Sequence, residues 1–294
     1  MNYLYSSCDV YTIDNTTNRW LAHECPEKPH TYWIHSDNYL ASLVLETYDP
    51  HNTMFTGMAE NITESMDHEL YLNGTNPISP YMVLDMTLNK SDFPSGGTKD
   101  SILRTVDGAS IMITTYDAPG PLHPINYSDI AFLQAILYSK LGDENHAMAA
   151  FNDGVYRWDG NGFKDDPFTN PNSSSYLKYQ TYKLALYIYA CRILDHVESQ
   201  GSNYTLALNT LLTMQDPNGN GGFNTSYNWT SDDARVHGTG GMNTETTCLA
   251  ILALNRQSSG HDSLSWAYFV LPISILIACA AIITWLKLRD STKK

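Results

Sequence analysis

The sequence predicts a mainly α-helical fold built of repeated helical hairpins, followed by one transmembrane helix. Apolar residues recur at helical spacing in several segments, separated by loops rich in glycine, asparagine and proline. A glycine-rich loop followed by an apolar helix occurs twice. An uncharged apolar run near the C-terminal end is long enough to cross a bilayer. The rest of the 294-residue chain is long enough for one large domain with a sizeable core.

The first expected helix covers residues 37–48, where Leu40 and Val44 fall on one helical face. It ends before Pro50, which cannot continue a helix. Asp143 is the expected N-cap of the helix at residues 143–158, the second helix of the first hairpin. The remaining expected helices form two hairpins and one last helix: residues 128–141 with 143–158, residues 176–197 with 204–215, and residues 244–254.

Residues 60–117 differ in kind from the rest of the domain. Their segment SILRTVDGASIMITTY, at residues 101–116, is typical of two short strands that turn at Asp107 and Gly108. We therefore expect a small β-rich insertion between the first helix and the first hairpin.

Two loops of similar sequence mark an internal repeat. WDGNGFKDDPF at residues 158–168 precedes the helix QTYKLALYIYA, and DPNGNGGFNTS at residues 216–226 precedes ETTCLAILAL. Because one loop of this kind follows each hairpin, a glycine turn with an aromatic residue recurs once per repeat. A repeated hairpin cannot bury both faces alone, so the copies are expected to stack or to close on each other.

In these loops and helices the chain resembles the α/α toroids, a fold shared by terpenoid cyclases, prenyltransferase β subunits and six-hairpin glycosidases. The resemblance covers residues 128–254 and extends more weakly to the helix at Asp37. It implies an active cavity lined by the N-terminal ends of the inner helices and by the loops before them.

Residues 264–286 are apolar, uncharged and long enough to span a hydrocarbon core of about 30 Å. Aromatic residues lie near both ends of this run, and residues 287–294 carry four Lys or Arg against one Asp. By the positive-inside rule that tail is cytoplasmic. We therefore expect an extracytoplasmic domain at residues 1–257, a linker at residues 258–263 and a single-pass protein of the cell membrane.

Potential N-glycosylation sites support an extracytoplasmic domain independently of hydropathy. The pattern N-x-[S/T] occurs at Asn15, Asn61, Asn73, Asn89, Asn126, Asn172, Asn203, Asn224 and Asn228. Residues 1–20 lack the basic and apolar regions of a signal peptide, so we expect the natural start to lie upstream of Met1. The alternative is insertion through the tail, which would leave these asparagines unmodified in the cytosol. The net charge of −14 disfavours nucleic acid as a partner.

Acidic residues stand in the first turns of three expected inner helices, and these are the candidate catalytic residues: Asp37, Asp129 and Glu245. Glycoside hydrolysis uses two carboxyl groups about 5–10 Å apart, one as acid and one as base or nucleophile. The alternative is a structural role, because an acid in the first turn complements the helix dipole and caps free N–H groups. Whether the chain is an enzyme stays open at this point.

Aromatic residues beside these helix starts are candidates for stacking on sugar rings: Trp158, Phe163, Tyr182 and Phe223. The alternative is burial in the core, which is the ordinary role of such residues.

The sequence contains no HExxH, CxxC, GxSxG or phosphate-binding loop, and it lacks the aspartate-rich motif of the terpene cyclases. Asp216, Asn218 and Asn220 match the opening of a calcium loop, but Tyr227 stands where the closing acid belongs. An ordinary turn is therefore favoured, and no cofactor is predicted. Two functions remain: a surface protein that binds or processes carbohydrate, or a non-catalytic glycosylated structural or adhesion protein.

Overall fold

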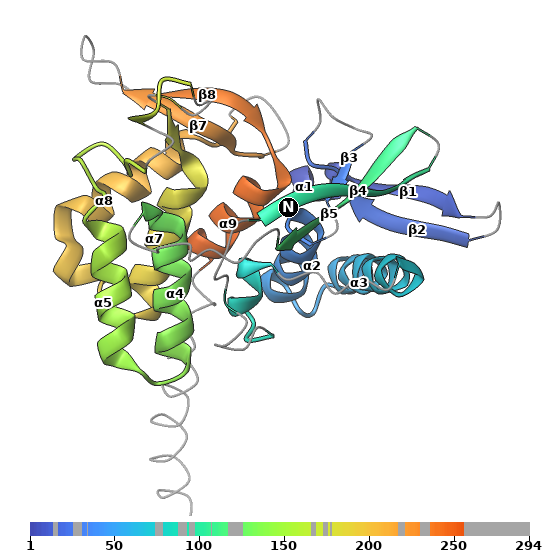
Figure 1. Cartoon of the computed structure of the whole chain (residues 1–294), viewed down its shortest axis with the longest axis horizontal. Helices are drawn as coiled ribbons and strands as arrows, with labels where there is room; N and C mark the ends of the chain where they lie inside the picture. Colours follow the sequence, from blue (N-terminus) through green and yellow to red (C-terminus); the bar gives the residue numbers. More distant parts are fainter. Residues whose placement is uncertain are drawn as a thin grey trace, which may run out of the picture. The chain divides into compact units, whose positions relative to one another are not determined.

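The computed structural model is mainly helical and includes three small sheets (Figure 1). It describes residues 1–13, 17–25, 31–33, 35–73, 79–87, 93, 98–106, 108–116, 126–165, 169–172, 176, 178–216, 221–229 and 236–255. The helices are α1 (Asn2–Ser7), α2 (Asp37–Tyr48), α3 (Thr53–Asn73), the 3-10 turn η1 (Pro80–Val83), α4 (Ser128–Lys140), α5 (Glu144–Val155), α7 (Thr181–Ile193), α8 (Val197–Thr213) and α9 (Thr244–Leu254).

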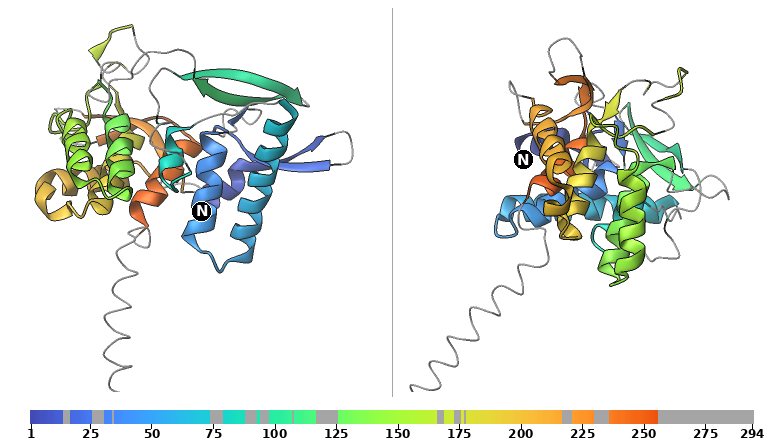
Figure 2. Two further views of the ribbon diagram at one scale, coloured as in Figure 1. Left: turned by 60° about the horizontal axis from the view of Figure 1, so that its bottom comes forward. Right: turned by 90° about the vertical axis from the view of Figure 1, so that its left-hand side faces the viewer.

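Four helices form a row in the order α2, α9, α7, α4, in which each helix packs against the next. The turn η1 packs against both α4 and α2, the two end members of the row. Figures 1 and 2 show α9, the last of these helices in the chain, between α7 and α2. Each of the other three carries an outer partner: α3 packs on α2, α5 on α4 and α8 on α7. Short turns join these pairs, as in antiparallel helical hairpins.

Local sequence signals explain where these helices begin. The Asp143 side chain accepts a hydrogen bond from the backbone N–H of His146 and caps α5. The Asn243 side chain does the same for the N–H of Thr246 and caps α9. Each cap satisfies a backbone donor that the helix itself leaves unpaired. Gly142, with φ +75°, takes the left-handed conformation that the turn between α4 and α5 requires.

Aromatic residues of the two hairpins form the centre of the core around α4. The Phe132 ring lies 5.1 Å from that of Phe163 in an edge-to-face contact, and 5.6 Å from that of Tyr187. All three side chains are almost fully buried. Burial of rings of this size stabilises the hairpins against each other.

Each of the two similar loops is closed by an isolated antiparallel β-bridge to its phenylalanine. Trp158 forms an isolated β-bridge with Phe163 in the first loop, and Gln215 forms one with Phe223 in the second. A Cβ atom added to the glycine before each phenylalanine would lie 2.4 Å from a tyrosine ring, that of Tyr179 or Tyr3. Both loops therefore require glycine at this position, which explains why the G-F pair recurs.

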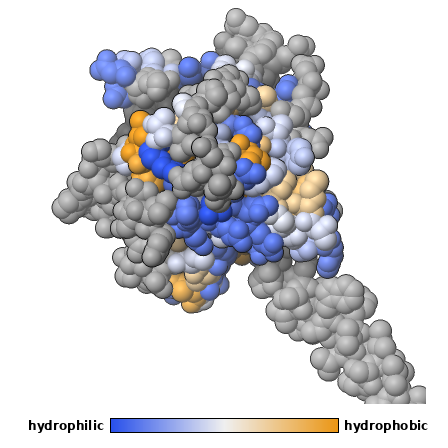
Figure 3. Space-filling view, turned by 90° about the vertical axis from the view of Figure 1, so that its right-hand side faces the viewer, coloured by the Kyte–Doolittle hydropathy of each residue, from blue (hydrophilic) through white to orange (hydrophobic). Residues whose placement is uncertain are grey.

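The three sheets are formed by short strands. These are β1 (Cys8–Ile13) and β2 (Thr17–Ala22); β3 (Thr31–Trp33), β4 (Thr98–Val106) and β5 (Ala109–Tyr116); and β6 (Tyr179–Gln180), β7 (Asn224–Trp229) and β8 (Val236–Met242). The pairings are antiparallel except that of β3 with β5. The expected hairpin is confirmed as β4 and β5, and Gly108 in its turn has φ +83°. On the face drawn in Figure 3, hydrophobic residues form small separate patches among hydrophilic ones.

Several expected boundaries are wrong. Residues 53–73 form the helix α3, so the region from residue 60 is not a β insertion throughout; Met58, Ile62 and Met66 of α3 are buried at a spacing of four residues. Helix α7 begins at Thr181 rather than at residue 176, because Tyr179 and Gln180 pair with β7 as a strand. Helix α8 runs from Val197 to Thr213 but is kinked at Gly201, whose φ of +46° and ψ of −112° are not helical, so its part after the kink begins close to the expected start at residue 204.

Residues 1–255 form one compact unit. The expected linker at residues 258–263, the membrane span at 264–286 and the tail at 287–294 lie outside the described residues. Among the helices of the described part, none combines the length and the apolar content that a membrane crossing requires.

Candidate functional site

The N-terminal ends of α4, α7 and α9 meet beside η1. Four residues with acidic or phenolic side chains lie there, and we call them the acid–phenol cluster: Tyr81 of η1, Asp129 of α4, Tyr182 of α7 and Glu245 of α9. They come from distant parts of the sequence, and only the packing of the helix row brings them together.

Each of the two acids accepts one hydrogen bond from one of the two phenols. Tyr182 Oη donates to Asp129 Oδ2 at 3.2 Å, and Tyr81 Oη donates to Glu245 Oε1 at 2.6 Å. Burial raises the pKa of both phenols well above the ordinary value, and the charges of Asp129 and Glu245 raise the pKa of each phenol further. Both phenols therefore stay protonated and act as hydrogen-bond donors.

An ion pair lies beside the cluster, at the start of α7. Lys183 Nζ donates to Asp165 Oδ2, and the two side chains are 6% and 2% exposed. Asp165 Oδ1 also accepts hydrogen bonds from the backbone N–H and the Oγ–H of Ser128, at 3.1 and 3.0 Å. Asp165 thus caps the first turn of α4 from another part of the chain and links α4 to α7.

Asp129 has two carboxylate oxygens in different surroundings. Oδ2 accepts the hydrogen bond from Tyr182, whereas Oδ1 is buried and has no hydrogen-bond donor among the described residues. Lys183 Nζ lies 3.9 Å from Oδ1. Burial raises the pKa of Asp129, Lys183 lowers it, and the charge of Asp165 raises it. Asp129 is therefore the carboxyl group of the cluster that holds a proton more readily than an ordinary aspartate.

The third predicted acid, Asp37, lies in the first turn of α2 and is 3% exposed. Its Oδ1 accepts a hydrogen bond from Ser36 Oγ at 3.1 Å. After burial, its charge is the strongest contribution that raises the pKa of Cys248, a residue of α9 one turn beyond Glu245. Asp37 is thus buried against α9, and we leave it out of the cluster.

The predicted aromatic set divides between the core and the cluster. Phe163 is 3% exposed and Phe223 is 2% exposed, so both pack in the core and their rings cannot stack on a sugar. Trp158 is half-buried and lies 5.1 Å from the Phe163 ring. Tyr182 belongs to the cluster through Asp129.

Sequence reasoning did not single out Tyr81, Asp165 or Lys183. Tyr81 lies in a short turn with no helical or strand pattern. Lys183 did carry a signal, because a lysine in the apolar segment TYKLALYIYA requires a buried partner.

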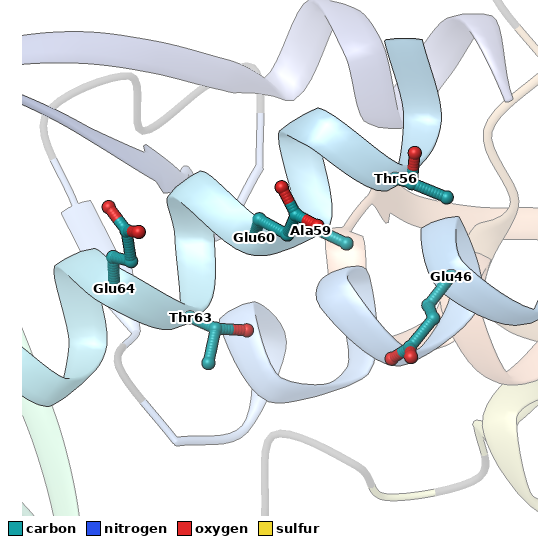
Figure 4. A pocket seen from close by; sticks show the side chains of 6 residues that line it. All are labelled: Glu46, Thr56, Ala59, Glu60, Thr63 and Glu64. Atoms are coloured by element: carbon teal, nitrogen blue, oxygen red, sulfur yellow. The ribbon is translucent and has the colours of Figure 1, made fainter. Parts of the chain in front are cut away.

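Away from this cluster, a hollow of about 380 Å³ lies between α2 and α3 (Figure 4). Its lining includes the carboxylates of Glu46, Glu60 and Glu64. Glu46 stands in the last turn of α2, at the other end of that helix from Asp37. These glutamates are exposed, and the hollow offers an acidic surface without the buried hydrogen bonds of the acid–phenol cluster.

The remaining predicted sites are distributed as follows. Within the described ranges, no group of His, Cys, Asp and Glu is arranged to hold a metal ion. Of the candidate calcium residues, Asn218 and Asn220 lie outside those ranges. Asn15 and Asn89 do as well, whereas Asn61 and Asn172 are exposed.

Four further sequon asparagines are at least partly covered. Asn126, Asn203, Asn224 and Asn228 are half-buried. The Asn224 Nδ2 donates to the carbonyl of Met214 at 3.0 Å, so this amide is engaged within the fold. Asn73 is the last residue of α3.

No protein-family model matches this chain, and no curated protein sequence matches it.

Proposed function

We propose that this chain is a membrane-anchored extracytoplasmic protein whose helical domain binds or processes carbohydrate at the acid–phenol cluster. The observation that carries the proposal is the meeting of Asp129 and Glu245, each hydrogen-bonded to a buried tyrosine, at the N-terminal ends of neighbouring helices. The row α2, α9, α7, α4 with its outer partners supports an α/α toroid-like arrangement, in which such ends line the active cavity.

The two acids differ in a way that suits hydrolysis of a glycosidic bond. Asp129, whose pKa burial raises, is the proposed general acid that protonates the leaving oxygen. Glu245 is the proposed base or nucleophile, and the hydrogen bond from Tyr81 fixes its orientation. Neutral phenols next to carboxylates also suit hydroxyl groups, because a phenol both donates and accepts hydrogen bonds.

The membrane anchor in this proposal rests on the sequence. The apolar run at residues 264–286 is followed by a basic tail, and the sequons all precede it. Asn61 and Asn172 are exposed, as N-glycosylation requires.

The experiment is a panel of oligosaccharides tested with the full chain in detergent micelles. Binding is measured by calorimetry and hydrolysis by chromatography of the products. We expect Asp129→Asn and Glu245→Gln each to lower turnover by at least about 100-fold, because each removes a proton-transfer group. The matched control is Asp153→Asn, an exposed acid of α5. If no sugar is bound or cleaved, or if all three variants behave alike, the carbohydrate proposal is wrong.

The second candidate is a non-catalytic glycosylated structural or adhesion protein. It is favoured by Asp165, whose carboxylate is fully used in capping α4 and pairing with Lys183. In that case the acids serve helix capping and packing alone. The parent chain would then carry N-glycans but would neither bind nor cleave any oligosaccharide of the panel.

A further inference from the structure

Lys183 occupies a position that is unfavourable for a cation. It is the third residue of α7, where the helix dipole is positive, and its side chain is only 6% exposed. Both the dipole and the loss of hydration act against an ammonium group there. An apolar residue would pack at such a position without this cost. The contacts between Lys183 and the surrounding acids therefore indicate what the lysine does there.

Two carboxylates face the Lys183 ammonium, and they do so differently. Asp165 Oδ2 accepts a direct hydrogen bond, and its other oxygen caps α4. Asp129 Oδ1 is 3.9 Å away, which is too long for a hydrogen bond but close enough for a strong effect of charge. Lys183 therefore acts on Asp129 electrostatically and leaves Oδ1 without a bound donor in the described part of the chain.

We propose that Lys183 is a positioning residue, which together with Asp165 holds Asp129 with Oδ2 hydrogen-bonded to Tyr182 and Oδ1 beside the Lys183 ammonium. The ion pair joins α4 to α7 at the turn that carries Asp129, so it sets both the place and the charge balance of that acid. The relevance of this arrangement to catalysis rests on the proposed function, whereas the titration of Asp129 does not.

Among the described residues, the charged or titratable groups around Asp129 that belong to packed elements all enter this balance. These groups are Tyr182 and Lys183 of α7, Asp165 of the loop after α5, Tyr81 of η1 and Glu245 of α9. Among them Lys183 is the cation and lowers the pKa of Asp129, whereas the Asp165 carboxylate raises it. Removal of Lys183 and removal of Asp165 must therefore shift the titration of Asp129 in opposite directions.

The test is a carbon-13 NMR titration of the full chain in detergent micelles, with aspartate labelled at the side-chain carboxyl. The signal of Asp129 is assigned by its loss in Asp129→Asn. We expect Lys183→Met to raise the pKa of Asp129 by about 1–3 units and Asp165→Asn to lower it. The double variant, which contains neither charge, is expected to titrate between the parent chain and Lys183→Met, because Lys183 affects the pKa of Asp129 more strongly than Asp165 does. Lys178→Met, which removes an exposed lysine, is the matched control.

Opposite shifts of the Asp129 pKa in the two single variants distinguish a positioning role from simple damage to the fold, which would not depend on the sign of the removed charge. Shifts in the same direction for both single variants, or shifts no larger than that of Lys178→Met, would overturn the inference. The double variant keeps the test valid if one single variant fails to fold, because it removes both members of the Lys183–Asp165 ion pair together. A titration equal to that of the parent chain is the result that overturns the proposal in that case. Failure of the parent chain to bind any sugar would refute the proposed function and leave the titration result unchanged.

Discussion

Gly57 and Gly154 offer a matched test of how tightly the core below the acid–phenol cluster is packed. Both glycines are helical, in α3 and α5. A Cβ at Gly57 meets nothing within 4 Å, whereas a Cβ at Gly154 would lie 2.5 Å from the Phe132 ring. That ring is buried and contacts Phe151 and Phe163, so it has no open space into which it can move.

The two Gly→Ala substitutions share one favourable contribution and differ in one unfavourable contribution. Alanine is favoured over glycine in a helix by up to about 1 kcal/mol. An extra methyl group forced into a packed core costs about 1–3 kcal/mol. We therefore expect Gly57→Ala to stabilise the domain by up to about 1 kcal/mol, and Gly154→Ala to be about 1–3 kcal/mol less stable than Gly57→Ala.

Thermal unfolding followed by circular dichroism measures this difference. For a domain of this size, 1 kcal/mol corresponds to about 2–4 °C in Tm. The Gly57→Ala variant is thus expected to melt above the parent chain, and the Gly154→Ala variant at least about 2–4 °C below Gly57→Ala. Equal melting temperatures would show that Phe132 does not pack on Gly154 as described, and would contradict the placement of α4 on α5.

Three further predictions concern single groups. Tyr81→Phe removes the hydrogen bond to the half-buried Glu245 and is expected to cost about 1–2 kcal/mol in the free energy of unfolding by urea. His35 is buried and burial lowers its pKa to about 4 from 6.5, so the folded state binds fewer protons than the unfolded state between these pH values. Its contribution to stability is complete above pH 6.5 and is lost as the pH falls toward 4; His35→Leu is expected to flatten this slope in urea titrations, and an unchanged slope would contradict the burial of the ring. On the proposed extracytoplasmic placement, Asn61→Gln and Asn172→Gln, at sequons whose asparagines are exposed, are each expected to lower the mass of the protein by one glycan, as measured by mass spectrometry before and after enzymatic deglycosylation.

Helices with a clear start signal in the sequence could be predicted closely. The bounds of α2 and α9 agree with the expected ones, and α4 differs by one residue at its end. Asp143 caps α5 as expected, because a side chain that accepts from its own helix is a local feature of the sequence. Such interactions do not depend on the rest of the fold.

The sequence pattern predicts the wrong structure where an element depends on contacts with distant parts of the chain. Tyr179 and Gln180 continue an apolar helical pattern, yet they form a strand because β7 offers them backbone partners. In α3, polar residues between the buried ones hid a four-residue spacing of Met58, Ile62 and Met66. Local propensity does not contain these partners, so the sequence pattern alone could not decide them.

The candidate site shows the same division. Asp129 and Glu245 could be named because acids in the first turns of apolar helices are visible in the sequence. Their association through Tyr81 and Tyr182 depends on the order of the helices in the row, which the sequence pattern does not reveal. Phe163 and Phe223 were placed in the ligand site because the loop motif does not distinguish a buried ring from an exposed one.

The position of α9 has a consequence for how the protein is made. This helix is the last of the domain to leave the ribosome, yet its apolar surface separates α2 from α7. Until Thr244–Leu254 is available, those two helices expose faces that lack their native cover, and such faces favour aggregation. A chain shortened before Asn243 should therefore aggregate or be degraded, rather than accumulate as a folded fragment.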